Sequence, residues 1–76
     1  MNNSKRSKLI KALSMLSEAE ALVSDVLDDE QESIDNLPEN LSGSELYEKM
    51  EAAIDALASA IEQIHDASGC VEEAME

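Results

Sequence analysis

Residues 4–36 contain neither glycine nor proline, and apolar residues recur every three or four positions through this stretch. At about 100° per residue, such spacing gathers them on one stripe of an α-helix. Acidic residues occupy the opposite face, although Glu20 and Glu30 fall close to the stripe and interrupt it. We therefore expect a helix over about 4–36, capped by Ser4 or Ser7. The stripe comprises Leu9, Leu13, Leu16, Val23, Leu27, Ile34 and Leu37, with Ala12, Ala19 and Val26 beside it.

A turn is predicted at residues 37–43. The single proline of the chain lies here and disfavours helical backbone at the residue before it. Ser42 begins an S-x-x-E capping box that can start a second helix, and Ser44 is the competing cap. Leu37 and Leu41 are apolar residues inside the turn, and we expect them to close the end of the hydrophobic core.

The second helix is expected over about 44–74, again with an apolar stripe at helical spacing. Val71 and Met75 keep the phase of this stripe, so we expect the helix to continue through Gly69. Alanine recurs every seven residues, which permits a second helix to approach closely. The stripe and these alanines comprise Leu46, Met50, Ala53, Ile54, Leu57, Ala60, Ile61, Ile64, Ala67, Val71, Ala74 and Met75.

Two helices of similar length and a short turn predict an all-α fold, an antiparallel two-helix hairpin that forms a single domain over 1–76. The chain has one Tyr and no Phe or Trp, a composition poor in strand-forming residues. So short a chain buries little core, and each apolar stripe is too wide for one partner helix. We therefore expect hairpins to assemble into a homo-oligomeric helical bundle, a homodimer or a higher oligomer.

Charge divides the chain into two unequal parts. It has 18 acidic and five basic residues, for a net charge of −13. Four of the five bases precede Glu18, the first acidic residue. The acidic remainder repels nucleic acid and anionic membranes at long range. The basic start is therefore the one region that favours a phosphate.

These four bases lie at the expected start of a helix, where free N–H groups and the helix dipole attract anions. Tyr47, the only aromatic residue, offers a surface on which a nucleobase can stack. It begins the other helix, so it reaches the basic end only if a second subunit packs antiparallel. The alternative is that the basic end pairs with the acids of a neighbouring subunit. The predicted ligand-binding residues are Lys5, Arg6, Lys8, Lys11 and Tyr47.

No catalytic residue, metal site or cofactor is predicted, and we expect the chain not to be an enzyme. Glu62 and His65 have the Glu-x-x-His spacing of di-metal bundles, but the helical phase turns Glu62 outward and His65 to the boundary. The acid-rich segment 28–32 and Asp35 resemble a calcium loop in composition but lack the glycine that such a loop requires. Cys70 has no general base beside it and is interpreted as a partly buried thiol. No apolar stretch is long enough to span a membrane.

The residues around the turn resemble a known group of proteins. Residues 29–45, which contain the motif Asn-Leu-Pro-Glu at 36–39, and the following residues 47–55 are similar to small acidic helical proteins of phages and mobile elements of Gram-positive bacteria. The resemblance covers about residues 15–67. That group has no settled biochemical role, so the resemblance assigns no functional residue to this chain. It implies a short phage or prophage gene, and the single cysteine without an export signal favours the cytoplasm of the host cell.

Two binding functions fit this context. The leading expectation is a counter-defence protein that sequesters a nucleotide immune signal as a homo-oligomeric sponge. The chain resembles such proteins in its small size, its expected oligomerisation and its basic spot with one aromatic residue. The alternative is an acidic DNA mimic or adaptor that blocks a basic host nucleic-acid-binding protein. The net charge of −13 on a rod favours the mimic, whereas the basic start contributes nothing to it.

Overall fold

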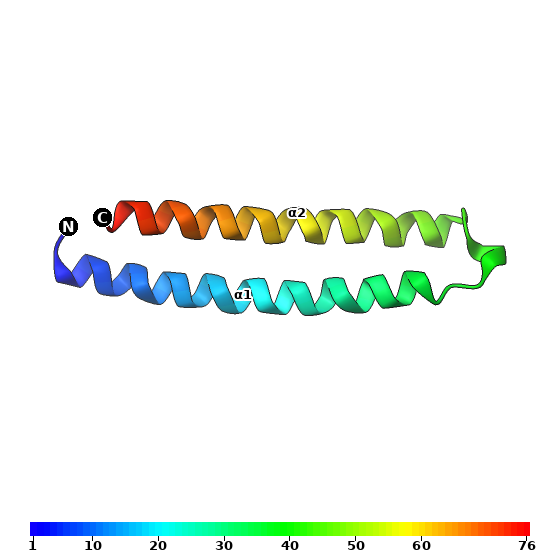
Figure 1. Cartoon of the computed structure of the whole chain (residues 1–76), viewed down its shortest axis with the longest axis horizontal. Helices are drawn as coiled ribbons and strands as arrows, with labels where there is room; N and C mark the ends of the chain where they lie inside the picture. Colours follow the sequence, from blue (N-terminus) through cyan, green and yellow to red (C-terminus); the bar gives the residue numbers. More distant parts are fainter.

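The computed structural model describes residues 1–76 and consists of two long helices. Helix α1 spans Asn3–Asp35, helix α2 spans Glu45–Ala74, and a short 3-10 turn, η1, spans Glu39–Leu41 between them. The helices lie side by side and antiparallel, with both termini at one end of the rod (Figure 1). The expected all-α fold with two packed helices is therefore confirmed. The Cα trace measures 59 × 15 × 13 Å.

Helix α1 begins at a different cap from those expected. The Oδ1 atom of Asn2 accepts a hydrogen bond from the backbone N–H of Lys5 at 2.8 Å. Ser4 and Ser7 lie inside the helix, so the expectation that one of them is the cap was wrong. Asparagine caps a helix as well as serine does, and capping at Asn2 keeps the first turn helical. The positive end of α1 thus lies almost at the chain terminus.

Ser44, rather than Ser42, caps helix α2. The Oγ atom of Ser44 accepts a hydrogen bond from the backbone N–H of Tyr47 at 3.2 Å. Between the two serines, Gly43 has a φ of 82°, a left-handed conformation that glycine adopts at little cost. This bend separates Ser42 from α2, and the Ser42 N–H donates to the Glu39 carbonyl instead. Once begun, α2 continues through Gly69 to Ala74.

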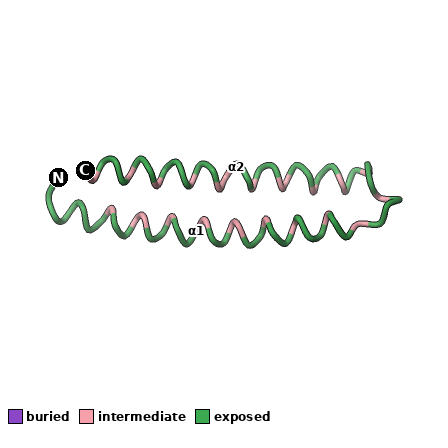
Figure 2. The backbone as a smooth tube through the Cα atoms, viewed as in Figure 1, coloured by how far each residue is buried: buried purple, intermediate pink, exposed green.

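The hydrophobic contact of the hairpin is a single seam along the facing sides of the helices. Half-buried residues recur at alternating spacings of three and four, the heptad pattern of a coiled coil. Figure 2 shows these half-buried turns facing one another along the rod. The seam positions on α1 and just beyond its end are Leu9, Leu13, Leu16, Glu20, Val23, Leu27, Glu30, Ile34 and Leu37. Those on α2 are Tyr47, Met50, Ile54, Leu57, Ile61, Ile64, Ser68, Val71 and Met75.

No residue of the hairpin is fully buried: 0 of 76 side chains are shielded from water on all sides. A seam between only two helices covers each side chain from one direction and leaves the other open. Leu37 and Leu41, which were expected to close the end of the core, are half-buried at the turn. Because apolar burial stabilises by roughly 25 cal/mol per Å², the half-covered seam leaves much of the available stabilisation unused.

Candidate functional site

The four bases predicted to contact an anion lie in the first turns of α1, and all are exposed. The hairpin contains two ion pairs, and neither involves these bases. One joins Lys49 Nζ to Glu45 Oε1 at 3.5 Å, and the other joins His65 Nδ1 to Glu20 Oε1 at 3.8 Å. The first turn of α1 contains no acidic residue. Its unpaired N–H groups and the bases around them make this end locally positive.

The fold places carboxylates beside that positive end. The C-terminal turns of α2 run alongside the start of α1 (Figure 1) and carry Glu72 and Glu73, and Glu76 follows the end of the helix. None of the three surface hollows of the hairpin is lined by any of the four bases. Within one subunit, a phosphate at the basic end therefore meets an open surface with acids close by.

Tyr47 lies at the other end of the rod, next to the turn. It occupies a half-buried seam position beside a hollow that is also lined by Asp35, Glu51 and Asp55. Three carboxylates around the ring disfavour the phosphate of a nucleotide. One subunit thus does not bring Tyr47 together with the four bases, and the predicted ligand site needs a second, antiparallel subunit.

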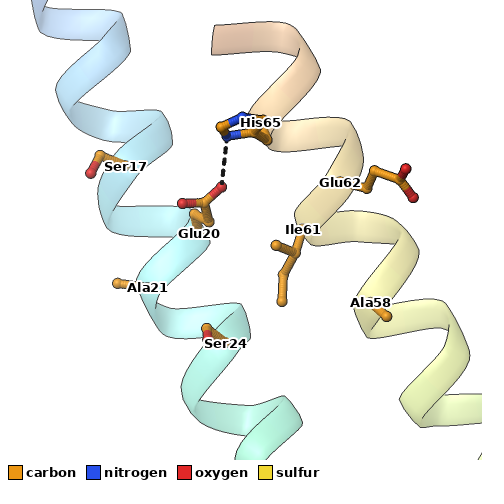
Figure 3. A pocket seen from close by; sticks show the side chains of 8 residues that line it. All are labelled: Ser17, Glu20, Ala21, Ser24, Ala58, Ile61, Glu62 and His65. Carbon is orange, nitrogen blue, oxygen red and sulfur yellow. Dashed lines mark ion pairs between the residues drawn. The ribbon is translucent and has the colours of Figure 1, made fainter. Parts of the chain in front are cut away.

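The largest hollow, of about 690 Å³, is lined by residues from the middle of both helices, and Figure 3 shows it from close by. The Glu20–His65 ion pair crosses the seam at this point, and the His65 side chain is 82% exposed. Glu62 points away from α1, as the helical phase predicted (Figure 3). No three His, Cys, Asp or Glu side chains are grouped closely enough to hold a metal ion. The lining residues are Ser17, Glu20, Ala21, Ser24, Ala58, Ile61, Glu62 and His65.

The two flanks of the seam differ in character. All three hollows open on one flank, which we call the grooved face; its residues directly follow seam positions, as Ser17, Ser24, His65 and Glu72 do. On the other flank, most of the residues that directly precede seam positions are apolar, and many of them are alanine; Lys8, Asp29 and Lys49 are charged exceptions. No hollow forms on this flank. We call this flank the alanine face. It comprises Ala12, Ala19 and Val26 of α1 and Leu46, Ala53, Ala60, Ala67 and Ala74 of α2.

Acidic residues are concentrated toward the turn. Residues 25–55 hold eleven of the 18 acids and a single base, Lys49, which is already paired with Glu45. All of these acids except Glu30 are exposed, and Asp35, Glu51 and Asp55 line a hollow on the grooved face. The turn end of the rod is therefore a strongly negative surface without a competing cation.

Cys70 is exposed, so its interpretation as a partly buried thiol was wrong. It lies one residue before the seam position Val71 but on the outer side of the alanine face, beyond the reach of α1. His65 lies five residues earlier, on the grooved face. Cys70 is thus a solvent-facing thiol that does not share a face with the only imidazole of the chain.

Comparison with models of known protein families, with curated proteins and with solved structures found no match. Neither helix has an apolar segment long enough to cross a lipid bilayer.

Proposed function

We propose that this chain is a non-catalytic binding protein, a homo-oligomeric acidic rod that occupies a basic nucleic-acid-binding surface of a host protein. The observation that carries the proposal is charge per unit length. A net charge of −13 along 59 Å gives about one charge per 4.5 Å for one hairpin, and about one per 2.3 Å for two hairpins side by side. Duplex DNA carries about one charge per 1.7 Å of its axis. A pair of hairpins thus approaches the charge density that such host surfaces recognise.

Rigidity and charge placement support the same function. Two continuous helices hold the carboxylates in a fixed array, so little conformational entropy is lost when a partner binds. The negative surface near the turn steers a basic partner into contact and accelerates association. The resemblance to small phage proteins fits a target inside a bacterial host.

A competition experiment tests this function. Purified basic DNA-binding proteins of a Gram-positive host are mixed with labelled duplex DNA, and the acidic protein is titrated in while bound DNA is followed by gel shift. We expect release of DNA from at least one host protein, with weaker competition as salt rises because exposed charges are screened. If every host protein tested keeps its DNA at low salt, the proposal is wrong.

A charge-reduced variant provides the matched control. Asp28→Asn, Glu32→Gln, Glu48→Gln and Asp55→Asn remove four exposed charges from the turn end without adding bulk. We expect this variant to stay helical by circular dichroism and to compete less well. Equal competition by variant and parent would show that the acidic surface does not provide the binding.

Nucleotide sequestration is the second candidate, favoured by the four unpaired bases around the free N–H groups of α1. In this function Lys5, Arg6, Lys8 and Lys11 contact phosphates, and Tyr47 of an antiparallel subunit stacks on a base. A panel of cyclic and linear oligonucleotide signals is added, and the melting temperature is measured. A ligand of the native state raises it. No shift with any signal, together with DNA release in the competition assay, would favour the acidic function.

A further inference from the structure

A second apolar stripe runs along α1 outside the seam. Ala12, Met15, Ala19, Leu22 and Val26 follow the same three- and four-residue spacing as the seam, one flank away. Their larger members are left in water: Met15 is 61%, Leu22 67% and Val26 51% exposed. We call these five residues the outer stripe. A helix with two adjacent apolar stripes is suited to contact two neighbouring helices, and the hairpin supplies only one.

The outer stripe and the alanine face form one continuous surface. Val26, Ala19 and Ala12 belong to both, and α2 adds small side chains that let another backbone approach closely. The alanine face extends over residues 46–74 of α2, about 42 Å at 1.5 Å per residue, and the Cα trace is 15 Å wide, so the face offers roughly 600 Å². Specific, stable interfaces bury about 600–1,000 Å² on each partner. The face therefore reaches the lower end of the size that a dimer needs.

The ends of the outer stripe carry opposite charges. Its spacing continues to Lys8 and Lys5 toward the N-terminus and to Asp29 toward the turn. Two copies packed parallel place the lysines beside lysines and Asp29 beside Asp29. Two copies packed antiparallel place the lysines of each beside Asp29 of the other. The antiparallel arrangement also separates the two acidic turn ends, which repel one another.

Side-chain size selects the same arrangement. When the stripe is set antiparallel on its own copy, one register puts Ala12 opposite the partner's Leu22 and Met15 opposite the partner's Ala19. Met15 and Leu22 then each meet an alanine, which fills space without overlap. Val26 lies opposite the partner's Lys8, whose aliphatic stem can cover it. In this same register Lys5 lies opposite the partner's Asp29. Charge and packing thus agree on one alignment.

We infer that two hairpins form an antiparallel homodimer through the alanine face, with α1 packed on the α1 helix of the second copy and Lys5 paired with the partner's Asp29 at both ends. The product is a four-helix bundle in which the seam, open on one side in the hairpin, is covered. The inference rests on the homo-oligomer of the proposed function and specifies its interface. It is tested without any host protein, so its failure is distinguishable from failure to bind a basic target.

The first experiment tests the face by sedimentation equilibrium. Leu22→Glu puts a charge in the outer stripe, whereas Ala21→Glu puts the same charge on the grooved side one residue earlier. We expect the parent and Ala21→Glu to sediment as dimers, and we expect the dimer dissociation constant of Leu22→Glu to be at least tenfold higher. Equal weakening by both variants, or a monomeric parent at micromolar concentration, would overturn the inference.

The second experiment tests the ion pair by charge exchange. Lys5→Glu puts an acid in the first turn of α1, and Asp29→Lys puts a base near its last turns, so each change favours the isolated helix through its dipole. Each single variant nevertheless creates two like-charge contacts in the dimer, and we expect dimer affinity to fall about tenfold. The double variant restores both opposite-charge pairs and with them the affinity. Additive weakening in the double variant would refute the pairing.

The third experiment reads the orientation directly. Asn40→Cys with Cys70→Ser places the only thiol in the turn, at one end of the rod. In an antiparallel dimer the two thiols are separated by about the rod length of 59 Å, a separation that spin labels attached to them can measure. A short bis-maleimide cannot bridge that distance. Efficient cross-linking between the two turns would establish a parallel dimer and overturn the antiparallel arrangement.

Discussion

Glu30 is a carboxylate at a seam position, and replacing it with leucine should stabilise the hairpin. It is half-buried between the seam residues Leu27 and Ile34, and no cation is paired with it. The opposite side of the seam is apolar at this level, where Ile54 lies. A carboxylate here loses part of its hydration and gains no partner, whereas leucine continues the apolar heptad pattern.

The size of the effect follows from the burial. Full burial of a leucine side chain contributes about 1.5–3 kcal/mol, and a half-buried seam position gives roughly half of that. A gain of about 1 kcal/mol corresponds to a rise in melting temperature of about 4–8 °C for a domain of this size. The assay is thermal unfolding, monitored through the circular dichroism signal of the helices. The protein concentration is kept fixed, because the melting temperature of an oligomer depends on it.

Glu32→Leu is the matched control for Glu30→Leu. Glu32 lies two residues further along the same helix, is exposed, and loses the same single charge when it is replaced. We expect its melting temperature to change by less than about 2 °C, because an exposed leucine gains no burial. If both variants gain equally, relief of acidic repulsion rather than seam packing is the cause, and the reasoning from burial is refuted.

Three further predictions concern the ends, the glycines and the cross-seam ion pair. Asn2→Ala removes the cap of α1 and should cost about 1 kcal/mol, seen as a lower melting temperature and faster amide exchange in the first turn only. Gly69→Ala should stabilise by up to about 1 kcal/mol, because the added Cβ meets nothing within 4 Å in a regular helix. Gly43→Ala should destabilise by about 1–2 kcal/mol, because its φ of 82° strains any other residue. Thermal melting checks both glycine predictions, since the melting temperature should rise for Gly69→Ala and fall for Gly43→Ala. His65→Ala should leave the melting temperature within about 2 °C, since its bond to Glu20 is exposed, and a large drop would show that the pair is structural.

The phase of each helix was predictable because the spacing of apolar residues encodes it directly. Leu9 through Leu37 lie on the seam as expected, and Glu20 and Glu30 interrupt it where the pattern placed them. The helix caps were less predictable. Asn2, Ser4, Ser42 and Ser44 can all accept a hydrogen bond from a helix start, and the choice depends on backbone angles such as the φ of Gly43.

The division into two faces could not be predicted from either helix alone. The recurrent alanines of α2 were visible in the sequence, but their meeting with Ala12, Ala19 and Val26 depends on which flank the antiparallel register brings together. The contact between Glu20 and His65 depends on the same register, because these residues are far apart in the chain. The half-buried seam as a whole sets this alignment and brings the two separate patterns together on one surface.

The arrangement of the lysines bears on which binding function the protein performs. Lys5 and Lys8 continue the outer stripe, whereas Arg6 and Lys11 project from other sides of α1, because successive helical positions are about 100° apart. If Lys5 is engaged with the partner's Asp29, a phosphate at this end meets at most the remaining bases, with Glu72, Glu73 and Glu76 nearby. In that arrangement Lys5 acts in assembly and is neutralised by Asp29, whereas Arg6, Lys8 and Lys11 keep their charge. Most of the acids of residues 25–55 remain free for a basic partner, as the proposed function requires.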